Sequence, residues 1–226
     1  MKNLKTYKMF ESSVELTPEQ IEWLDKCTKG TWKLNPTTGE VDVDGGFDCS
    51  DQGLRDFKGV RFGEVGGNFY CRNNQLTTLE GAPREVGRDF RCEYNQLTTL
   101  EGAPQEVGRD FRCEYNQLTT LEGAPKEVRG AFSCDNNQLT TLEGAPQEVE
   151  GGFYCRNNPV SQKTLKSIFR VMETGKGYLE ATEYLWPEIP LEDQALLYRP
   201  EFEWVVGDEK RKMDALKAYQ GFKGML

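Results

Sequence analysis

The chain has 226 residues, contains no histidine and carries a formal net charge of −9. This acidic balance argues against nucleic-acid binding, which a basic surface usually supports. The lack of histidine excludes Ser–His and Cys–His catalytic couples and histidine-ligated metal sites. We therefore expect a non-enzymatic protein without a metal ion or cofactor.

Residues 1–45 are expected to form an N-terminal cap of one helix and one hairpin. Residues 1–13 resemble a loose arm with charge but no apolar core, so they are not a signal peptide. Thr17, Pro18 and Gln20 predict a helix start with a capping box, and Gly30 is a natural stop. Apolar stretches at 32–34 and 41–43 flank a turn-forming segment and predict a hairpin.

Residues 46–160 contain a repeat with a period of 21 residues. Four nearly identical copies run from Phe69 to Gly152, and a truncated copy follows to residue 160. A degenerate copy from Phe47 to Val65 is one residue longer and lacks an asparagine that the others share. Self-similarity at this period indicates a solenoid in which each coil stacks on the next. The shared asparagines are Asn74, Asn95, Asn116, Asn137 and Asn158.

Within the repeat, the segment that begins with phenylalanine predicts a strand. Phe90 and Cys92 alternate with polar residues, which is the pattern of a strand with one buried face. The Gly-Ala-Pro sequence that follows excludes a long helix, so the return path should consist of turns and extended chain. One coil buries too little apolar surface to be stable alone. We therefore expect a parallel hydrogen-bond ladder and a core that continues between coils.

Six of the seven cysteines occupy one repeat position and should form an inward-facing column. We interpret them as small apolar core residues, because paired C-x-x-C ligands and histidines are both missing. Free buried thiols also suit a reducing compartment. The six are Cys49, Cys71, Cys92, Cys113, Cys134 and Cys155, and Cys27 is expected to be structural as well.

Residues 161–226 predict several short helices. Leu165, Ile168 and Phe169 have helical spacing, and Asp208 opens a final charged helix. The simplest role of this segment is a helical C-terminal cap that covers the last coil. An independent interaction module is the alternative.

The repeat pattern F-x-C-x-x-N-x-L-x-x-L-x-G-x-P resembles a leucine-rich repeat of the short bacterial and tailed-bacteriophage type. The resemblance implies an α+β leucine-rich-repeat solenoid, with a short parallel β-sheet on the concave face, irregular return segments and helical caps. It implies that the asparagine amides bond the backbone of neighbouring coils. No apolar run is long enough to span a bilayer. We expect a monomeric cytoplasmic protein, in the host cytoplasm if a phage encodes it.

The outward positions of the strand and its flanks are the candidate partner-binding residues on the expected concave face. Arginines lie between rows of acidic residues with tyrosines at the margins, and Tyr and Arg commonly anchor protein interfaces. The alternative is that Arg91 and Arg112 only neutralise neighbouring glutamates. The candidates are Tyr70, Arg72, Asp89, Arg91, Glu93, Tyr94, Asp110, Arg112, Glu114, Tyr115, Asp135, Tyr154 and Arg156.

Two columns of glutamate should also run along the solenoid, and stacked like charges repel. A divalent cation could relieve this repulsion, although the aspartate- and glycine-rich loops of calcium-binding solenoids are missing. The alternative is that the glutamates lie at a solvated edge, where Arg84 or Lys126 offsets part of their charge. The columns are Glu80, Glu101, Glu122 and Glu143, and Glu85, Glu106, Glu127 and Glu148.

These features predict a non-enzymatic scaffold that binds another protein through its concave face. Two alternatives stay open. One is an acidic, phage-type inhibitor or decoy that blocks a basic host protein surface. The other is a structural spacer whose contacts lie in the helical tail.

Overall fold

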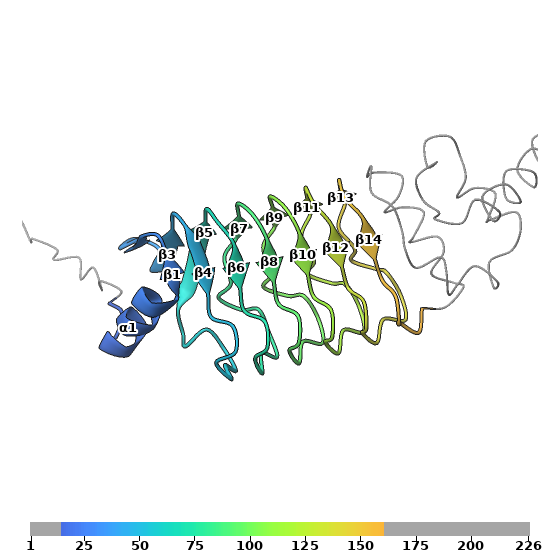
Figure 1. Cartoon of the computed structure of the whole chain (residues 1–226), viewed down its shortest axis with the longest axis horizontal. Helices are drawn as coiled ribbons and strands as arrows, with labels where there is room; N and C mark the ends of the chain where they lie inside the picture. Colours follow the sequence, from blue (N-terminus) through green and yellow to red (C-terminus); the bar gives the residue numbers. More distant parts are fainter. Residues whose placement is uncertain (1–14, 161–226) are drawn as a thin grey trace, which may run out of the picture.

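The computed structural model describes residues 15–160, which form a β-solenoid with two parallel sheets (Figure 1). Each full coil contributes one short strand to each sheet. In spatial order, sheet A contains β1 (Thr28–Lys29), β4 (Gly46–Asp48), β6 (Phe69–Tyr70), β8 (Phe90–Arg91), β10 (Phe111–Arg112), β12 (Phe132–Ser133) and β14 (Phe153–Tyr154). Sheet B contains β13 (Glu148–Val149), β11 (Glu127–Val128), β9 (Glu106–Val107), β7 (Glu85–Val86), β5 (Arg61–Val65), β3 (Glu40–Val43) and β2 (Trp32–Leu34).

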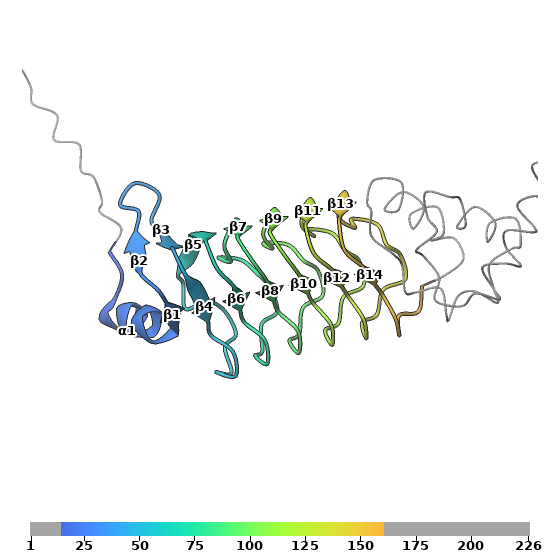
Figure 2. The same cartoon turned by 45° about the horizontal axis from the view of Figure 1, so that its top comes forward.

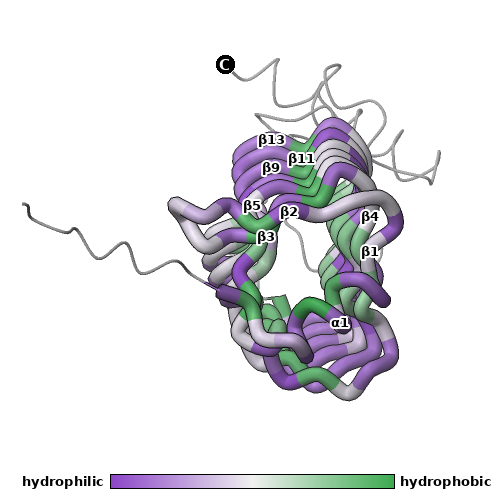
Figure 3. Tube along the Cα trace, turned by 90° about the vertical axis from the view of Figure 1, so that its left-hand side faces the viewer, coloured by the Kyte–Doolittle hydropathy of each residue, from purple (hydrophilic) through white to green (hydrophobic). Residues whose placement is uncertain are grey.

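The prediction of a leucine-rich-repeat fold with one sheet on a concave face is wrong. The Glu-Val pair of each repeat, expected in an irregular return path, forms a second parallel ladder in which Glu106 pairs with Glu127 and Val107 with Val128. The view along the stack shows the two sheets on different sides of the coils (Figure 3). Within residues 15–160 the only α-helix is α1 (Pro18–Cys27). The proposed helical cap at 161–226 lies outside the described residues.

The core consists of identical side chains stacked from coil to coil. Phe69, Phe90 and Phe111 are fully buried, and consecutive rings lie 5.5 and 5.1 Å apart in nearly parallel planes. Leucine and valine columns complete the interior. All seven cysteines are free and buried, so their interpretation as core residues is confirmed. Burial raises the pKa of these thiols, most strongly along the repeat column.

The repeated asparagines join neighbouring coils through their side-chain amides. Asn95 Nδ2 donates to the carbonyl oxygens of Cys71 (3.0 Å) and Cys92 (3.1 Å). Asn95 Oδ1 accepts from Leu76 N at 3.0 Å. The same bonds recur at Asn74 and at the later copies. Buried backbone groups at the bend are thereby satisfied, as buried polar groups must be.

The helix and the hairpin predicted for the N-terminal segment are present, whereas the arm predicted at 1–13 lies outside the described residues. Thr17 caps α1 in a capping box with Gln20. The strands β2 and β3 form the expected antiparallel hairpin, while β1 pairs antiparallel with β4 (Figure 2). The first coil carries Gln52 where later coils carry the asparagine. Its amide accepts from Trp23 Nε1 at 3.0 Å and donates to Cys27 Sγ at 3.3 Å, so this position now binds the cap.

No helix within residues 15–160 is long and apolar enough to cross a membrane.

Candidate functional site

The outer face of sheet A carries columns of polar side chains, because residues alternate between the core and the surface along each strand. Tyr70, Arg91 and Arg112 lie in register on β6, β8 and β10. The predicted partner-binding residues come together along this face, its adjoining turns and the segments that precede the strands. They lie on one of two sheets, and the expected concave face of a leucine-rich repeat is absent from the described residues.

Each central arginine forms an ion pair with an aspartate two residues earlier in its own coil. Arg91 lies 3.6 Å from Asp89, and Arg112 lies 3.2 Å from Asp110. The guanidinium of Arg91 also lies over the ring of Tyr70, 5.2 Å from its centroid. The aspartates therefore neutralise these arginines, in place of the glutamates that the sequence suggested.

The aspartate column also supports the backbone. Asp89 Oδ1 accepts from Asp110 N at 3.4 Å, and Asp110 Oδ1 accepts from Ala131 N at 3.0 Å. Asn68 occupies the same position one coil earlier, and its Oδ1 accepts from Asp89 N at 3.1 Å. Sequence reasoning assigned these aspartates only to partner binding. The signal for their structural role is a polar residue of the Asn/Asp type just before several strands.

Glu93 and Glu114 are stacked carboxylates in the turn that follows the strand. Glu93 is only 9% exposed. Burial raises the pKa of both carboxyl groups, against the opposing effect of hydrogen bonds and nearby arginines. The Oε2 atoms of Glu93 and Glu114 are buried, and neither has a hydrogen-bond donor in the described part of the chain. On the same face, Arg91 Nε and Arg112 Nε are also buried without a hydrogen-bond acceptor among the described residues.

Tyr94 and Tyr115 form an exposed aromatic pair beside these carboxylates. Their rings are parallel within 7°, with centroids 4.5 Å apart, and the two residues are 50% and 48% exposed. Both have a left-handed backbone, with φ of 57° and 53°. A bulky residue rarely adopts this conformation. Three other coils place asparagine here, at Asn73, Asn136 and Asn157, also with positive φ.

Sequence reasoning placed the tyrosines at the margin of the face but missed their backbone strain. The signal was available in the repeat. Asparagine is one of the few residues that tolerate the left-handed region, so its recurrence at this position predicts a positive φ. The tyrosines therefore stand where the backbone favours a smaller side chain.

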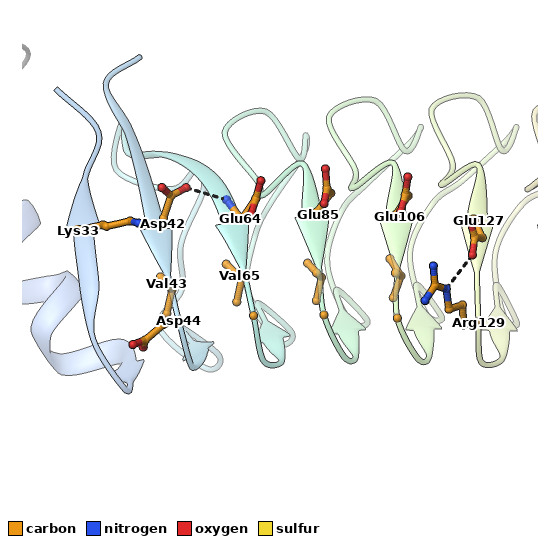
Figure 4. A pocket seen from close by; sticks show the side chains of 15 residues that line it. Lys33, Asp42, Val43, Asp44, Glu64, Val65, Glu85, Glu106, Glu127 and Arg129 are labelled. Carbon is orange, nitrogen blue, oxygen red and sulfur yellow. Dashed lines mark hydrogen bonds and ion pairs between the residues drawn. The ribbon is translucent and has the colours of Figure 1, made fainter. Parts of the chain in front are cut away.

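Sheet B presents a different, acidic surface. Its outward glutamates are in register from Glu64 through Glu85, Glu106 and Glu127 to Glu148. The first four of them border a shallow groove of about 440 Å³ that is also lined by the glycine column Gly66, Gly87 and Gly108 (Figure 4).

Arginines partly neutralise this acidic surface. Arg84 lies 3.4 Å from Glu64 and 3.7 Å from Glu85, and Arg129 lies 2.8 Å from Glu127. The other glutamate column, from Glu80 to Glu143, is exposed at the turns. No group of three metal-ligating side chains that could hold a metal ion occurs within residues 15–160.

No family model, no curated protein and no solved structure matches the chain.

Proposed function

We propose that the chain is a non-enzymatic scaffold that binds another protein through the outer face of sheet A. The observation that carries this proposal is the Tyr94–Tyr115 pair. A left-handed conformation costs a non-glycine residue roughly 1–2 kcal/mol. Stacking of two aromatic rings returns only about 0.5–1.5 kcal/mol. Half-exposed tyrosines at two strained positions therefore give the fold little benefit, which favours a role at the surface.

The rest of the face suits an interface. The side chains of Arg91 and Arg112 are held by their ion pairs with Asp89 and Asp110, and the strands beneath are fixed by the ladder. A surface that is ordered before binding loses less conformational entropy when a partner docks. Tyr and Arg are also the residue types that contribute most often to binding energy.

The test is to capture the natural partner with the full chain and to compare binding by variants. Tyr94→Asn with Tyr115→Asn, and separately Arg91→Ala with Arg112→Ala, should each weaken partner binding by about tenfold or more. Gln96→Ala with Gln117→Ala is the matched control, because these exposed residues lie in the same two coils and are not among the candidate residues of the face. Unchanged binding by both site variants would refute this face as the binding surface.

A second candidate is a decoy or inhibitor that blocks a basic protein surface with the glutamate ladder of sheet B. The observation in its favour is the unbroken register of the glutamates from Glu64 to Glu148. Binding driven by exposed charges should be lost at high salt. It should also weaken in Glu85→Gln with Glu106→Gln and persist in the tyrosine variant. The opposite pattern would exclude this candidate.

A structural spacer with contacts in the tail would use residues 161–226, which lie outside the described part of the chain. Deletion of residues 207–226 tests this alternative. Retained binding after the deletion would argue against it.

A further inference from the structure

We propose that the partner presents a cationic side chain, arginine or lysine, which stacks on the Tyr94–Tyr115 pair beside Glu93 and Glu114. This inference rests on the proposed function and names the chemistry of the partner at that same face. It joins three observations: an open aromatic surface, an excess of negative charge next to it, and carboxylate oxygens without donors.

The aromatic surface is the first observation. Tyr94 and Tyr115 cover each other's inner ring faces and are about half exposed, and asparagines stand at the same position in the coils on either side. A cation within about 6 Å of a ring centroid is attracted to the face of the ring. Within residues 15–160 this contact already occurs at two places. Arg91 lies 5.2 Å from the Tyr70 centroid, and Lys58 lies 5.5 Å from the Trp23 centroid.

The local charge is the second observation. On this face the two central coils carry four carboxylates, Asp89, Asp110, Glu93 and Glu114, against the two arginines Arg91 and Arg112. Arg72 of the preceding coil also acts on Glu93. The carboxylates of Glu93 and Glu114 lie close enough to the aromatic pair to affect it. Burial, the neighbouring Tyr115 and then the two glutamates all raise the pKa of the Tyr94 hydroxyl. The two carboxylates therefore favour a positive rather than a negative group beside the pair.

The unsatisfied carboxylate oxygens are the third observation. Glu93 is more than nine-tenths buried, yet its Oε2 has no donor among the described residues, and the same holds for Glu114 Oε2. The oxygens themselves are buried, so a guanidinium or ammonium group laid along the tyrosines compensates their charge without bonding to them. An anionic partner group would instead be repelled by both carboxylates. An uncharged aliphatic group would not compensate the negative charge of the carboxylates.

The experiment measures binding of fluorescein-labelled hexa-arginine and hexa-lysine peptides to the full chain by fluorescence anisotropy at physiological salt. Hexa-citrulline, which has the shape of hexa-arginine without its charge, is the uncharged control. We expect the cationic peptides to bind and the citrulline peptide to bind at least about tenfold more weakly. Equal binding of charged and uncharged peptides would overturn the proposal.

Variants separate a specific site from general attraction to an acidic chain. Tyr94→Asn with Tyr115→Asn should weaken hexa-arginine binding by about tenfold without changing the net charge. Glu93→Gln with Glu114→Gln should weaken it by a similar factor. The matched control is Glu101→Gln with Glu122→Gln, which removes the same charge from the same two coils at exposed turns. Equal weakening by the two glutamate pairs, or no effect of the tyrosine pair, would refute the inference.

The outcome also distinguishes this inference from the proposed function. If the captured natural partner depends on Tyr94 and Tyr115 but hexa-arginine neither binds nor competes, the cationic contact is wrong and the protein-binding face stands. If partner capture is also independent of the tyrosines, both are wrong. Competition by hexa-arginine that is lost in the tyrosine variant would support both.

Discussion

The asparagine ladder gives the sharpest prediction about stability. Asn95→Ala removes the only acceptor that the structure shows for Leu76 N, which lies in the preceding coil. A buried N–H without a partner costs about 1–3 kcal/mol. The carbonyls of Cys71 and Cys92, the two that lie closest to the Asn95 amide, each keep a second amide, from Asn74 and from Asn116. Loss of each hydrogen bond from the Asn95 amide to these carbonyls should therefore cost only about 0.5–1.5 kcal/mol.

The sum is a loss of about 2–6 kcal/mol in the free energy of unfolding. Urea unfolding of the full chain, followed by circular dichroism, measures this loss. Gln96→Ala is the matched control, because Gln96 is the next residue and is exposed. We expect its effect to stay within about 0.5 kcal/mol. If Asn95→Ala destabilised the chain no more than Gln96→Ala, the ladder would not hold the coils together.

Three further predictions concern the remaining columns. Burial raises the pKa of Glu93, so this carboxyl group holds its proton more tightly in the folded chain than in the unfolded chain. The free energy of unfolding should therefore fall as the pH rises from the ordinary glutamate pKa through the higher pKa of the folded chain. Glu93→Gln should flatten that decline and raise the free energy of unfolding at neutral pH by on the order of 1 kcal/mol; an unchanged slope in urea titrations across pH would contradict this. Cys113 should resist a thiol reagent until the chain unfolds, because burial raises its pKa, and rapid labelling of the native chain would contradict its place in the core. Gly108→Ala would bring a Cβ into a clash with Gly87 O, so it should destabilise the chain by more than about 1 kcal/mol in the same unfolding assay. A neutral effect would argue against the close approach of these two coils.

Much of the fold could be predicted from the sequence, because its signals repeat. The spacing of Phe90, Cys92 and the ladder asparagines specifies the stacking, the register and the inward columns. The capping box at Thr17 and the hairpin are local patterns, and both were correct. Sheet B could not be predicted in this way. The strand Glu106–Val107 is two residues long, too short to show alternation, and exists only because the coils on either side pair with it.

The candidate surface was predictable in composition but not in detail. The alternation of apolar and polar residues along the strand predicted that Arg91 and Arg112 face outward, and the structure agrees. Their pairing with aspartates of the same coil depends on side-chain geometry that no spacing rule gives. The burial of Glu93 and the stacking of the two tyrosines likewise arise from contacts between coils. The most specific support for the binding hypothesis therefore comes from side-chain contacts between coils.

The most direct test of the central claim is hydroxyl-radical footprinting of the full chain with and without its captured partner. Tyr94, Tyr115 and Ile21 are the exposed large hydrophobic residues of the described part of the chain, so all three should be oxidised in the free protein. If the partner docks on sheet A, it should suppress oxidation of Tyr94 and Tyr115 and leave Ile21, on α1 at the far end, unchanged. Full oxidation of both tyrosines in the bound complex would contradict the proposed surface.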